Sequence, residues 1–379
     1  MTSPHALHNR LIDDIGTLSA SDWNRVFGPR AEDHAFFRAC QDAVPDGFRF
    51  GAKAVFSGDK LIGAVPTFRL RYRMPVRDIV DKPWVDRFGS LPIEVQGIGS
   101  PLVDRCPLGI DPSLDQPTFN AAAELLLEPQ KPQRAIEVAV VKDVPEALAS
   151  RLDHVISKLG YAKVPTLPTA HLSLDKTTIT DFVESRERQA RKYLRRYVNL
   201  PEGLSVEQLT APGEQAQAFY DLYLAQQRAS KVDSGIFDGV APGFMAAVAR
   251  HKPEDTVFFA YKAQDELIGF SFSYVDQNEL TCKYIGVRQP IGRQFGLFNV
   301  DFIQLVRVAQ ERGIKRLNLG QGSYKTKTSF GGTLGKNWLL IRHPQNLPNA
   351  LVRRIASKLS FESMDPSIAE LRAEGIEPK

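Results

Sequence analysis

Residues 279–299 read ELTCKYIGVRQPIGRQFGLFN and carry the pattern on which the fold assignment depends. Residues 279–287 predict a β-strand, and the apolar run over residues 297–312 predicts a long buried helix. The loop between them and the strand end supply glycines and arginines: Gly286, Gly292, Gly296, Arg288 and Arg293. A strand, a glycine-containing loop and a helix N-terminus favour anion binding, because free N–H groups and the positive end of the helix dipole meet there.

The charge distribution agrees with an anionic ligand. The chain has 379 residues, with 48 Lys and Arg against 44 Asp and Glu, which gives a net charge of +4. The segment from Lys283 to Lys327 holds nine basic residues and two acidic ones, so the remainder of the chain is slightly acidic. A basic segment on such a chain indicates a phosphate or pyrophosphate ligand.

Composition excludes several classes of protein. A hydrophobic content of 43% and a charged content of 24% are typical of packed soluble domains. No apolar run approaches the roughly 18–20 residues of a membrane span, and residues 1–14 lack the apolar region of a secretory signal. The three scattered cysteines predict neither a disulfide scaffold nor a zinc site, so we expect a cytoplasmic protein.

The established catalytic motifs are absent from the sequence. It contains no phosphate-binding P-loop, no dinucleotide fingerprint after a strand and no serine nucleophile elbow. The seven histidines are spread without metal-ligand spacing, so no metal is expected.

Two halves of the chain repeat one pattern of helices followed by a hairpin. The hairpins at residues 48–70 and 256–275 both contain Leu-Ile-Gly, at residues 61–63 and 267–269. The proline-containing segment 164–169 predicts a stiff connection between the halves. The predicted domains are residues 1–165, residues 166–345 and a helical tail at residues 346–379.

Further elements follow from apolar periodicity and capping residues. Residues 74–110, rich in Pro and Gly, predict an irregular substrate-contacting insertion or lid. Helices are predicted after the caps at residues 19–22, around residues 36–40, and at residues 145–159, 181–198, 213–230 and 242–251; strands are predicted at residues 135–141 and 315–319.

The loop after residue 287 resembles the one that holds the cofactor pyrophosphate in the acyl-CoA N-acyltransferase (GNAT) superfamily. Its motif is Gln/Arg-x-x-Gly-x-Gly/Ala; Gln289 and Gly292 fit, while Gln294 stands where Gly or Ala is usual. The resemblance implies these cofactor-binding residues: Gly286, Val287, Arg288, Gln289, Gly292, Arg293 and Gly296.

A second motif runs from Leu317 through Gly-Gln-Gly-Ser-Tyr-Lys to Gly332 and a strand near Trp338. Together with the basic stretch 186–196, it resembles the BioF2-like acetyltransferase domain, a tandem GNAT relative of the FemAB peptidyltransferases. The resemblance covers residues 170–345 and the first half in outline. It implies an α/β fold of two GNAT-like units in tandem, each a mixed, mostly antiparallel sheet flanked by helices.

The resemblance also implies a chemistry: an amine attacks an acyl thioester directly in a ternary complex, and a backbone N–H of the central strand stabilises the oxyanion. Lys325, after an aromatic residue, is the expected charge-stabilising lysine, and Lys327 a weaker neighbour. Tyr324 and Tyr284 are candidate donors to the leaving thiolate, and His171 is a candidate general base. The alternatives are a solvated lysine, packed tyrosines and a structural histidine.

The expected substrate-binding residues lie on a basic helix and around the second motif: Arg188, Arg191, Lys192, Arg195, Asn318, Gln321 and Lys327. A solvated helix face is the alternative for the basic residues. As a ligand, this face suits an anionic headgroup, a nucleotide, a carrier protein or tRNA.

These observations predict a bacterial N-acyltransferase that uses acyl-CoA or an acyl-carrier thioester as co-substrate, with no permanently bound cofactor. The acceptor would be an amine of a lipid or envelope precursor, including a sphingoid base, and the protein could contact the inner membrane peripherally. The alternatives are a Fem-like transferase that uses aminoacyl-tRNA and a binding module without catalysis.

Overall fold

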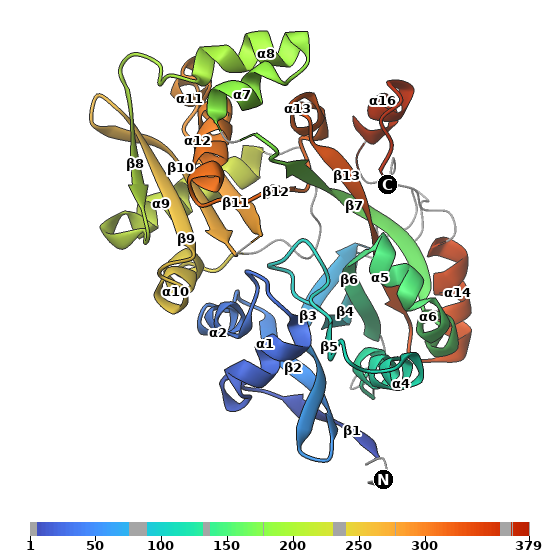
Figure 1. The fold of residues 1–379 in the computed structure, drawn as a ribbon. Helices are drawn as coiled ribbons and strands as arrows, with labels where there is room; N and C mark the ends of the chain where they lie inside the picture. The colour runs from blue at the N-terminus through green and yellow to red at the C-terminus, as the bar shows by residue number, and fades with distance from the viewer. Residues whose placement is uncertain are drawn as a thin grey trace.

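Two similar runs of strands and helices follow one another in the computed structural model of the chain (Figure 1). The structure describes residues 6–75, 89–131, 137–176, 178–229, 240–276, 278–356, 365 and 367–378. The first run comprises β1 (Leu7–Ile12), η1 (Ile15–Thr17), α1 (Ala20–Phe27), α2 (His34–Asp42), β2 (Phe48–Ser57), β3 (Lys60–Pro75), β4 (Ser90–Ile98), β5 (Gly109–Ile110), α4 (Gln116–Leu127), β6 (Glu137–Pro145), α5 (Glu146–Arg151), α6 (Asp153–Leu159) and β7 (Ala162–Ser173). The second run comprises α7 (Ile179–Glu184), α8 (Arg188–Leu194), η3 (Arg195–Tyr197), β8 (Leu204–Leu209), η4 (Gly213–Gln215), α9 (Ala216–Ala229), α10 (Phe244–His251), β9 (Thr256–Ala263), β10 (Glu266–Val275), β11 (Glu279–Val287), α11 (Ile291–Gln294), α12 (Leu297–Glu311), β12 (Arg316–Gly320), α13 (Tyr324–Ser329), β13 (Thr333–Arg342), α14 (Asn346–Ala356) and α16 (Ser367–Ala373).

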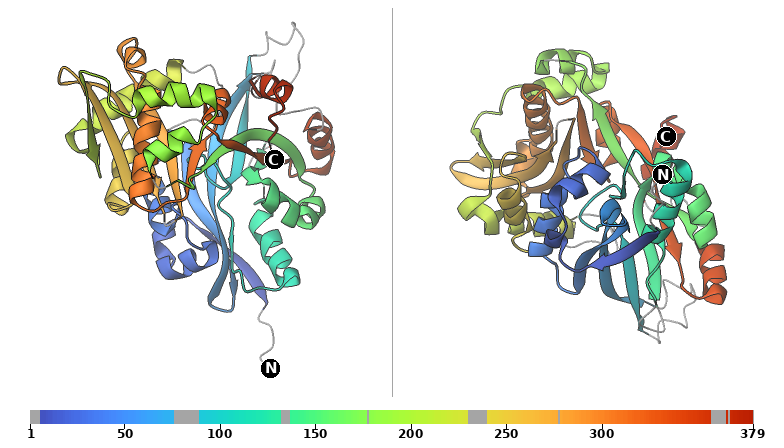
Figure 2. Two further views of the ribbon diagram at one scale, coloured as in Figure 1. Left: turned by 45° about the horizontal axis from the view of Figure 1, so that its top comes forward. Right: turned by 60° about the horizontal axis from the view of Figure 1, so that its bottom comes forward.

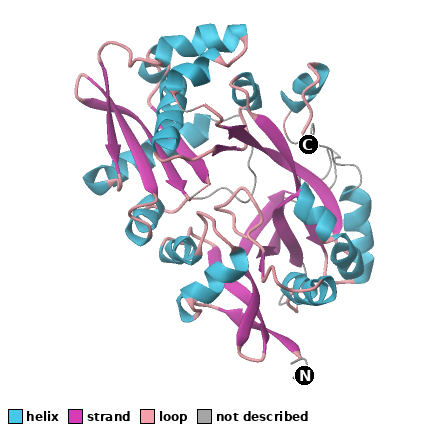
Figure 3. Cartoon of the chain, in the orientation of Figure 1, coloured by secondary structure: helices cyan, strands magenta, loops and turns pink. Residues whose placement is uncertain are grey.

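The described strands form one mixed sheet (Figure 3). Their order is β1-β2-β3-β4-β6-β13-β7-β12-β11-β10-β9-β8, and β5 pairs with β3 off this path. In each half four antiparallel strands are followed by a parallel neighbour, β6 beside β4 and β12 beside β11. The expected α/β fold with two GNAT-like units is therefore confirmed.

The two units are joined by an exchange of their last strands. β13, from the end of the second run, pairs with β6 of the first unit, and β7, from the end of the first run, pairs with β12 of the second. β7 and β13 also pair with each other, so they lie side by side between the units (Figure 2). Each unit thus completes its sheet with a strand of the other.

The repeated hairpins occupy equivalent places. β2 and β3 are the second and third strands of the first unit, and β9 and β10 hold the same positions in the second. Leu-Ile-Gly lies near the start of β3 and of β10 in both. The predicted correspondence of the hairpins is confirmed.

The core of the second unit has two layers, because successive side chains of β9 point to opposite faces. Phe259 and Tyr261 pack toward α12, whereas Phe258 packs with α9 and α10 on the other face. α12 is apolar on most sides and buries ten of its 15 residues. As predicted, it is part of the core.

Two segments have more regular structure than predicted. Residues 164–169, expected to be a connection, lie within β7, and Pro165 is opposite Trp338 of β13. A strand accommodates a proline where no N–H donor is needed. Residues 74–110, expected to be an irregular insertion, include β4, which holds buried Ile93 and Val95; residues 76–88 of that segment lie outside the described residues.

Two predicted helices are divided. The helix expected at residues 145–159 is divided at Leu152 into α5 and α6. The helix expected at residues 181–198 is divided into α7, α8 and η3. Between α7 and α8, the guanidinium of Arg186 lies over the ring of Phe182. It also donates to the carbonyl of Phe330 at 3.3 Å, and these contacts hold the chain where its direction changes.

Candidate active site

The central strands of the second unit separate partway along their length. β11 and β12 pair in parallel from Glu279 to Thr281 only, although β11 continues to Val287. Where they separate, Cys282 and Tyr284 pair with consecutive residues of β10, so Lys283 is an extra residue in β11. Such a bulge bends a strand and re-aims its side chains. Beyond it, one edge of β11 pairs with none of the described strands.

The open edge of β11 presents backbone donors. The N–H of Arg288 donates to the carbonyl of Ile268 in β10 over 2.8 Å. Because N–H directions alternate along an antiparallel strand, the N–H groups of Ile285 and Val287 point away from β10, toward the open edge. This edge can stabilise a carbonyl oxygen that gains negative charge.

The glycine loop lies at the end of this strand. A Cβ on Gly292 would lie 2.0 Å from the Val287 side chain, so the loop can fold back on β11 only with glycine here. Gly296, at φ 63°, precedes the first turn of α12. Arg288, Gln289 and Arg293 are exposed around the loop. The predicted cofactor residues from Val287 to Gly296 are therefore neighbours at one helix N-terminus.

Gly286 faces elsewhere. A Cβ on Gly286 would lie 2.7 Å from the backbone of Leu222 in α9 and 2.5 Å from the ring of Phe270. The missing side chain therefore lets α9 pack on β11. Gly286, which the resemblance implied as a cofactor-binding residue, therefore faces a helix of the protein.

The basic helix lies beside the glycine loop, where Figure 1 shows α7, α8 and α11 at the end of α12. A Cβ on Gly296 would lie 2.5 Å from the ring of Tyr197 in η3, and the Tyr193 hydroxyl of α8 accepts from Asn299 Nδ2 at 3.0 Å. Arg188 and Lys192 are exposed, whereas Arg191 and Arg195 bond to Glu184: Arg191 reaches its carbonyl and Arg195 holds its carboxylate with two bonds.

The two lysines of α13 point in different directions. Lys325 is exposed and forms an ion pair with Glu370 of α16, which raises the pKa of Lys325. Lys327 is half-buried, and its Nζ donates to the carbonyl of Gln321 at 2.8 Å. Burial lowers the pKa of Lys327 to about 8, against the opposing effect of the Asp104 carboxylate. The sequence favoured Lys325, but the arrangement of charges favours Lys327.

Asp104 joins the two units at the bulge. It lies between β4 and β5 of the first unit, and its Oδ1 accepts from Nζ of Lys283 at 3.0 Å. Only 5% of the Lys283 side chain is exposed, so the pair is largely removed from water. Burial alone would raise the pKa of Asp104, but Lys283, Lys142 and Lys327 lower it. Gly320, at the end of β12, leaves room for this carboxylate: a Cβ there would be 3.3 Å from Oδ2.

Two of the predicted substrate-binding residues form hydrogen bonds at the end of β12. Asn318 is buried, and its Oδ1 accepts from the N–H of Gly320 at 2.9 Å. Gln321 donates to the carbonyl of Leu167 at 2.9 Å and to Asp143 at 3.3 Å. Both side chains therefore shape the turn that leads to Lys327.

His171 lies on a polar face of the sheet, opposite Asn318. Its Nδ1 is 3.9 Å from Glu279 Oε2, which also pairs with Arg316 at 2.8 Å. Burial, Arg316 and Arg105 lower the pKa of His171 to about 3, whereas burial raises the pKa of Glu279. The environment therefore disfavours the charged imidazole, which argues against the role of His171 as a general base.

The two predicted tyrosines have packing contacts. The Tyr324 hydroxyl donates to the carbonyl of Pro168 at 2.8 Å, and burial raises its pKa. Tyr284 lies among the rings of Tyr223, Phe244 and Phe272. The four predicted catalytic residues therefore do not surround one point.

Sequence reasoning missed Lys283 and Asp104. A lysine inside the apolar strand 279–287 is a signal that could have been used, since a buried lysine requires a partner. Asp104 carried no such signal, because it is 179 residues from Lys283 in the chain.

Comparison with known proteins agrees with this geometry. Residues 184–328 match the family model of the acetyltransferase (GNAT) domain. FemX is similar with a TM-score of 0.56 and 11% identity over 88% of this chain and 96% of that one. A tandem GNAT protein from the clavulanic acid biosynthesis pathway reaches a TM-score of 0.52 and 11% identity, over 90% of this chain and 100% of the other.

The C-terminal domain of a putative lysylphosphatidylglycerol synthetase from Agrobacterium fabrum is also similar, with a TM-score of 0.50 and 13% identity over 91% of this chain and 96% of that one. No curated protein sequence matches the chain significantly. The protein thus has a tandem GNAT fold. Residues 184–328 match the GNAT domain model, and the tandem arrangement is similar to that of FemX and of the clavulanic acid pathway protein.

None of the helices in the described residues has the length and apolarity needed to cross a membrane. No group of three or more His, Cys, Asp or Glu side chains there is arranged to hold a metal ion.

Proposed function

We propose that the protein is an N-acyltransferase that moves an acyl group from a thioester to an amine at the open edge of β11. The observation that carries the proposal is the separation of β11 from β12 beside a glycine loop at the N-terminus of α12. A thioester whose phosphates lie on the loop can place its carbonyl carbon along β11.

In this reaction the amine nitrogen attacks the thioester carbon, the new C–N bond forms and the C–S bond breaks. The N–H groups of Ile285 and Val287 face the oxygen that gains charge. Lys327, held by the Gln321 carbonyl near Asp104, takes the charge-stabilising role that the sequence suggested for Lys325. The attacking amine loses a proton to solvent, and the thiolate that leaves takes up a proton from solvent.

The acceptor that we propose is an amine of a lipid or envelope precursor, including a sphingoid base. Exposed rings and cations near the loop support it: Tyr193 and Phe298 are 43% and 45% exposed, beside Lys192 and Arg293. Such a surface suits the interface of an anionic membrane, and we place the reaction at its cytoplasmic side.

The test is turnover by the full chain with three donors: acyl-CoA of several lengths, acyl-carrier protein and aminoacyl-tRNA. Release of free thiol and a product mass increased by one acyl group, with sphinganine or ethanolamine as acceptor, would support the proposal. Comparison of lipids and amines in cells with and without the protein then identifies the natural acceptor. Lack of turnover with every donor would leave a binding module as the better description.

A Fem-like transferase is the second candidate, favoured by the basic helix α8 beside the loop. If aminoacyl-tRNA is the donor, RNA binding should weaken steeply with salt and depend on Arg188 and Lys192. Transfer from tRNA without transfer from thioesters would select this function.

A further inference from the structure

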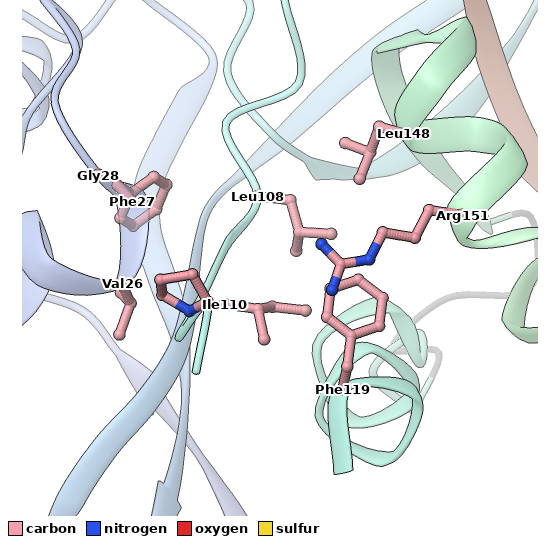
Figure 4. Close-up of a pocket in the computed structure, with 9 residues that line it drawn as sticks. Val26, Phe27, Gly28, Leu108, Ile110, Phe119, Leu148 and Arg151 are labelled. Atoms are coloured by element: carbon pink, nitrogen blue, oxygen red, sulfur yellow. The ribbon is translucent and has the colours of Figure 1, made fainter. Parts of the chain in front are cut away.

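A separate apolar pocket lies in the first unit (Figure 4). Its volume is about 200 Å³. It is lined by the end of α1, the segment around β5, and helices α4 and α5: Val26, Phe27, Gly28, Leu108, Ile110, Pro112, Phe119, Leu148 and Arg151. None of these residues belongs to the candidate active site.

The walls of the pocket are set by close packing in the first unit. A Cβ on Gly109 would lie 2.6 Å from the Phe27 ring, so the ring lies against the backbone of β5. Val26 and Phe119 are each only 3% exposed, so these two walls of the pocket belong to the core. At Gly28, by contrast, a Cβ would meet no atom within 4 Å, so the packing around this lining residue is loose.

One charged side chain points into this apolar space. The guanidinium carbon of Arg151 lies 3.6 Å from the centroid of the Phe119 ring, and Figure 4 shows the group directed toward Leu108 and Ile110. Stacking fixes the plane of a guanidinium and leaves its N–H edge available for an acceptor.

The described part of the chain supplies no anion to Arg151. The nearby carboxylate of Asp111 is occupied by Arg25 at 2.6 Å and by Lys60 at 3.2 Å. The pocket therefore combines apolar walls with the charge of an exposed arginine that is stacked on Phe119 and pairs with no carboxylate of the described residues. A planar guanidinium matches the geometry of a carboxylate or a phosphate.

We propose that this pocket binds the chain of an anionic amphiphile, with its carboxylate or phosphate on Arg151. At roughly 30 Å³ for a group of the size of a water molecule, the pocket holds about six or seven such groups. The ligand class is thus a short or medium acyl chain with an anionic end. Leu108 is four residues after Asp104, so the occupant lies against the segment that supplies the active-site carboxylate.

The test is calorimetric titration of the full chain with butanoate, hexanoate, octanoate and decanoate. Affinity should rise roughly fourfold per methylene while the pocket fills, then level off at about seven carbons. Octyl phosphate against octanoate distinguishes the two headgroups, and octanol measures the contribution of the chain alone. A continued rise through decanoate would indicate binding on an open surface and overturn the proposal.

Variants locate the site. Arg151→Gln should weaken octanoate binding at least tenfold and leave octanol binding unchanged, because one charge-assisted contact is lost. Leu148→Trp should fill the pocket and weaken both. Arg49→Gln, at an exposed arginine of β2, is the matched control and should bind like the natural protein. Octanoate binding to Arg151→Gln at full strength would overturn the proposal, even if Leu148→Trp does not fold.

Discussion

The two units share a strand order but differ where their parallel strands meet. In the first unit β4 pairs with β6 from Glu94 to Ile98, the last residue of β4. In the second unit β11 pairs with β12 only as far as Thr281 and continues to Val287. The same fold therefore has a closed central edge in one unit and an open edge in the other.

The helix N-termini differ in the same way. α4 begins after Asp115, whose carboxylate accepts from the N–H of Thr118 at 2.9 Å. α12 begins after Gly296, which has no side chain to occupy the helix end, and two arginines precede it. In the first unit, the carboxylate of Asp115 occupies the helix N-terminus. In the second unit, the corresponding helix N-terminus can bind an external anion.

The first unit contributes in another way. The segment between β4 and α4 carries β5 and brings Asp104 to Lys283 of the second unit. The second unit thus has the features expected of a site for the acyl donor, while the first unit supplies the Asp104 carboxylate to the second.

The largest effect is expected from Lys327→Met. If Lys327 stabilises charge in the transition state, kcat should fall roughly 10²–10³-fold, the size seen for loss of one oxyanion donor. Methionine keeps the apolar stem, so folding should persist. The measurement is single-turnover acyl transfer with saturating donor.

Lys325→Met is the matched control, on the same helix and paired with Glu370 at the surface. It should change kcat less than about threefold. Equal losses in the two variants would mean that α13 acts as a general electrostatic patch. A large loss in Lys325→Met alone would restore the role suggested by the sequence.

The next effect concerns the open helix end. Replacing both Arg288 and Arg293 by alanine should raise the donor KM at least about tenfold with little change in kcat, because charge-assisted contacts to phosphate are lost. Initial rates against donor concentration provide the measurement. If the acceptor KM rises and the donor KM does not, the loop binds the acceptor.

A smaller effect is expected from Asp104→Asn, which removes the contribution of the first unit. The pKa of Lys327 is lowered to about 8 by burial, and the Asp104 carboxylate opposes that shift. If Lys327 acts in its charged form, kcat should fall as pH rises through about 8, and the midpoint should move to lower pH in the variant.

We expect kcat of Asp104→Asn to be reduced roughly tenfold at neutral pH, as for a lost charge-assisted contact. Asp42→Asn, whose carboxylate lies 2.8 Å from Nε2 of His251 in the second unit, is the control for a change of charge between the units. An unchanged pH midpoint in Asp104→Asn would contradict the coupling of Asp104 to Lys327.

Much of the fold could be predicted because local patterns decide it. The hairpins with Leu-Ile-Gly, α1 after its Ser19 cap and the apolar helix α12 follow from periodicity and capping. The exchange of β7 and β13 could not be predicted in this way. It depends on pairing between segments more than 140 residues apart, and Pro165 and Pro168 gave the opposite signal.

For the candidate site, the sequence indicates which residues are neighbours within one continuous segment, but not the contacts that depend on assembly of the fold. The glycine loop is local, so its residues are neighbours in the fold. Lys325 and Lys327 are two residues apart on one helix and therefore point to different sides, and only the packing of α13 shows which one faces Asp104. The pairing of Asp104 with Lys283 could not be predicted either, because it also depends on how distant segments pack.

The smallest effect should come from Asp115→Ala, in the helix end of the first unit. The change removes the cap of α4, so the melting temperature should fall by about 1–3 °C, as expected for one lost cap in a protein of this size. Because the carboxylate occupies a position that no donor uses, KM for the thioester and kcat should both stay within about twofold of the natural protein. Thermal unfolding and initial rates on the same preparation measure the two effects together. A donor KM that improves in Asp115→Ala would show that the first unit also retains an anion site, masked by its own cap, and would end the division between the two units.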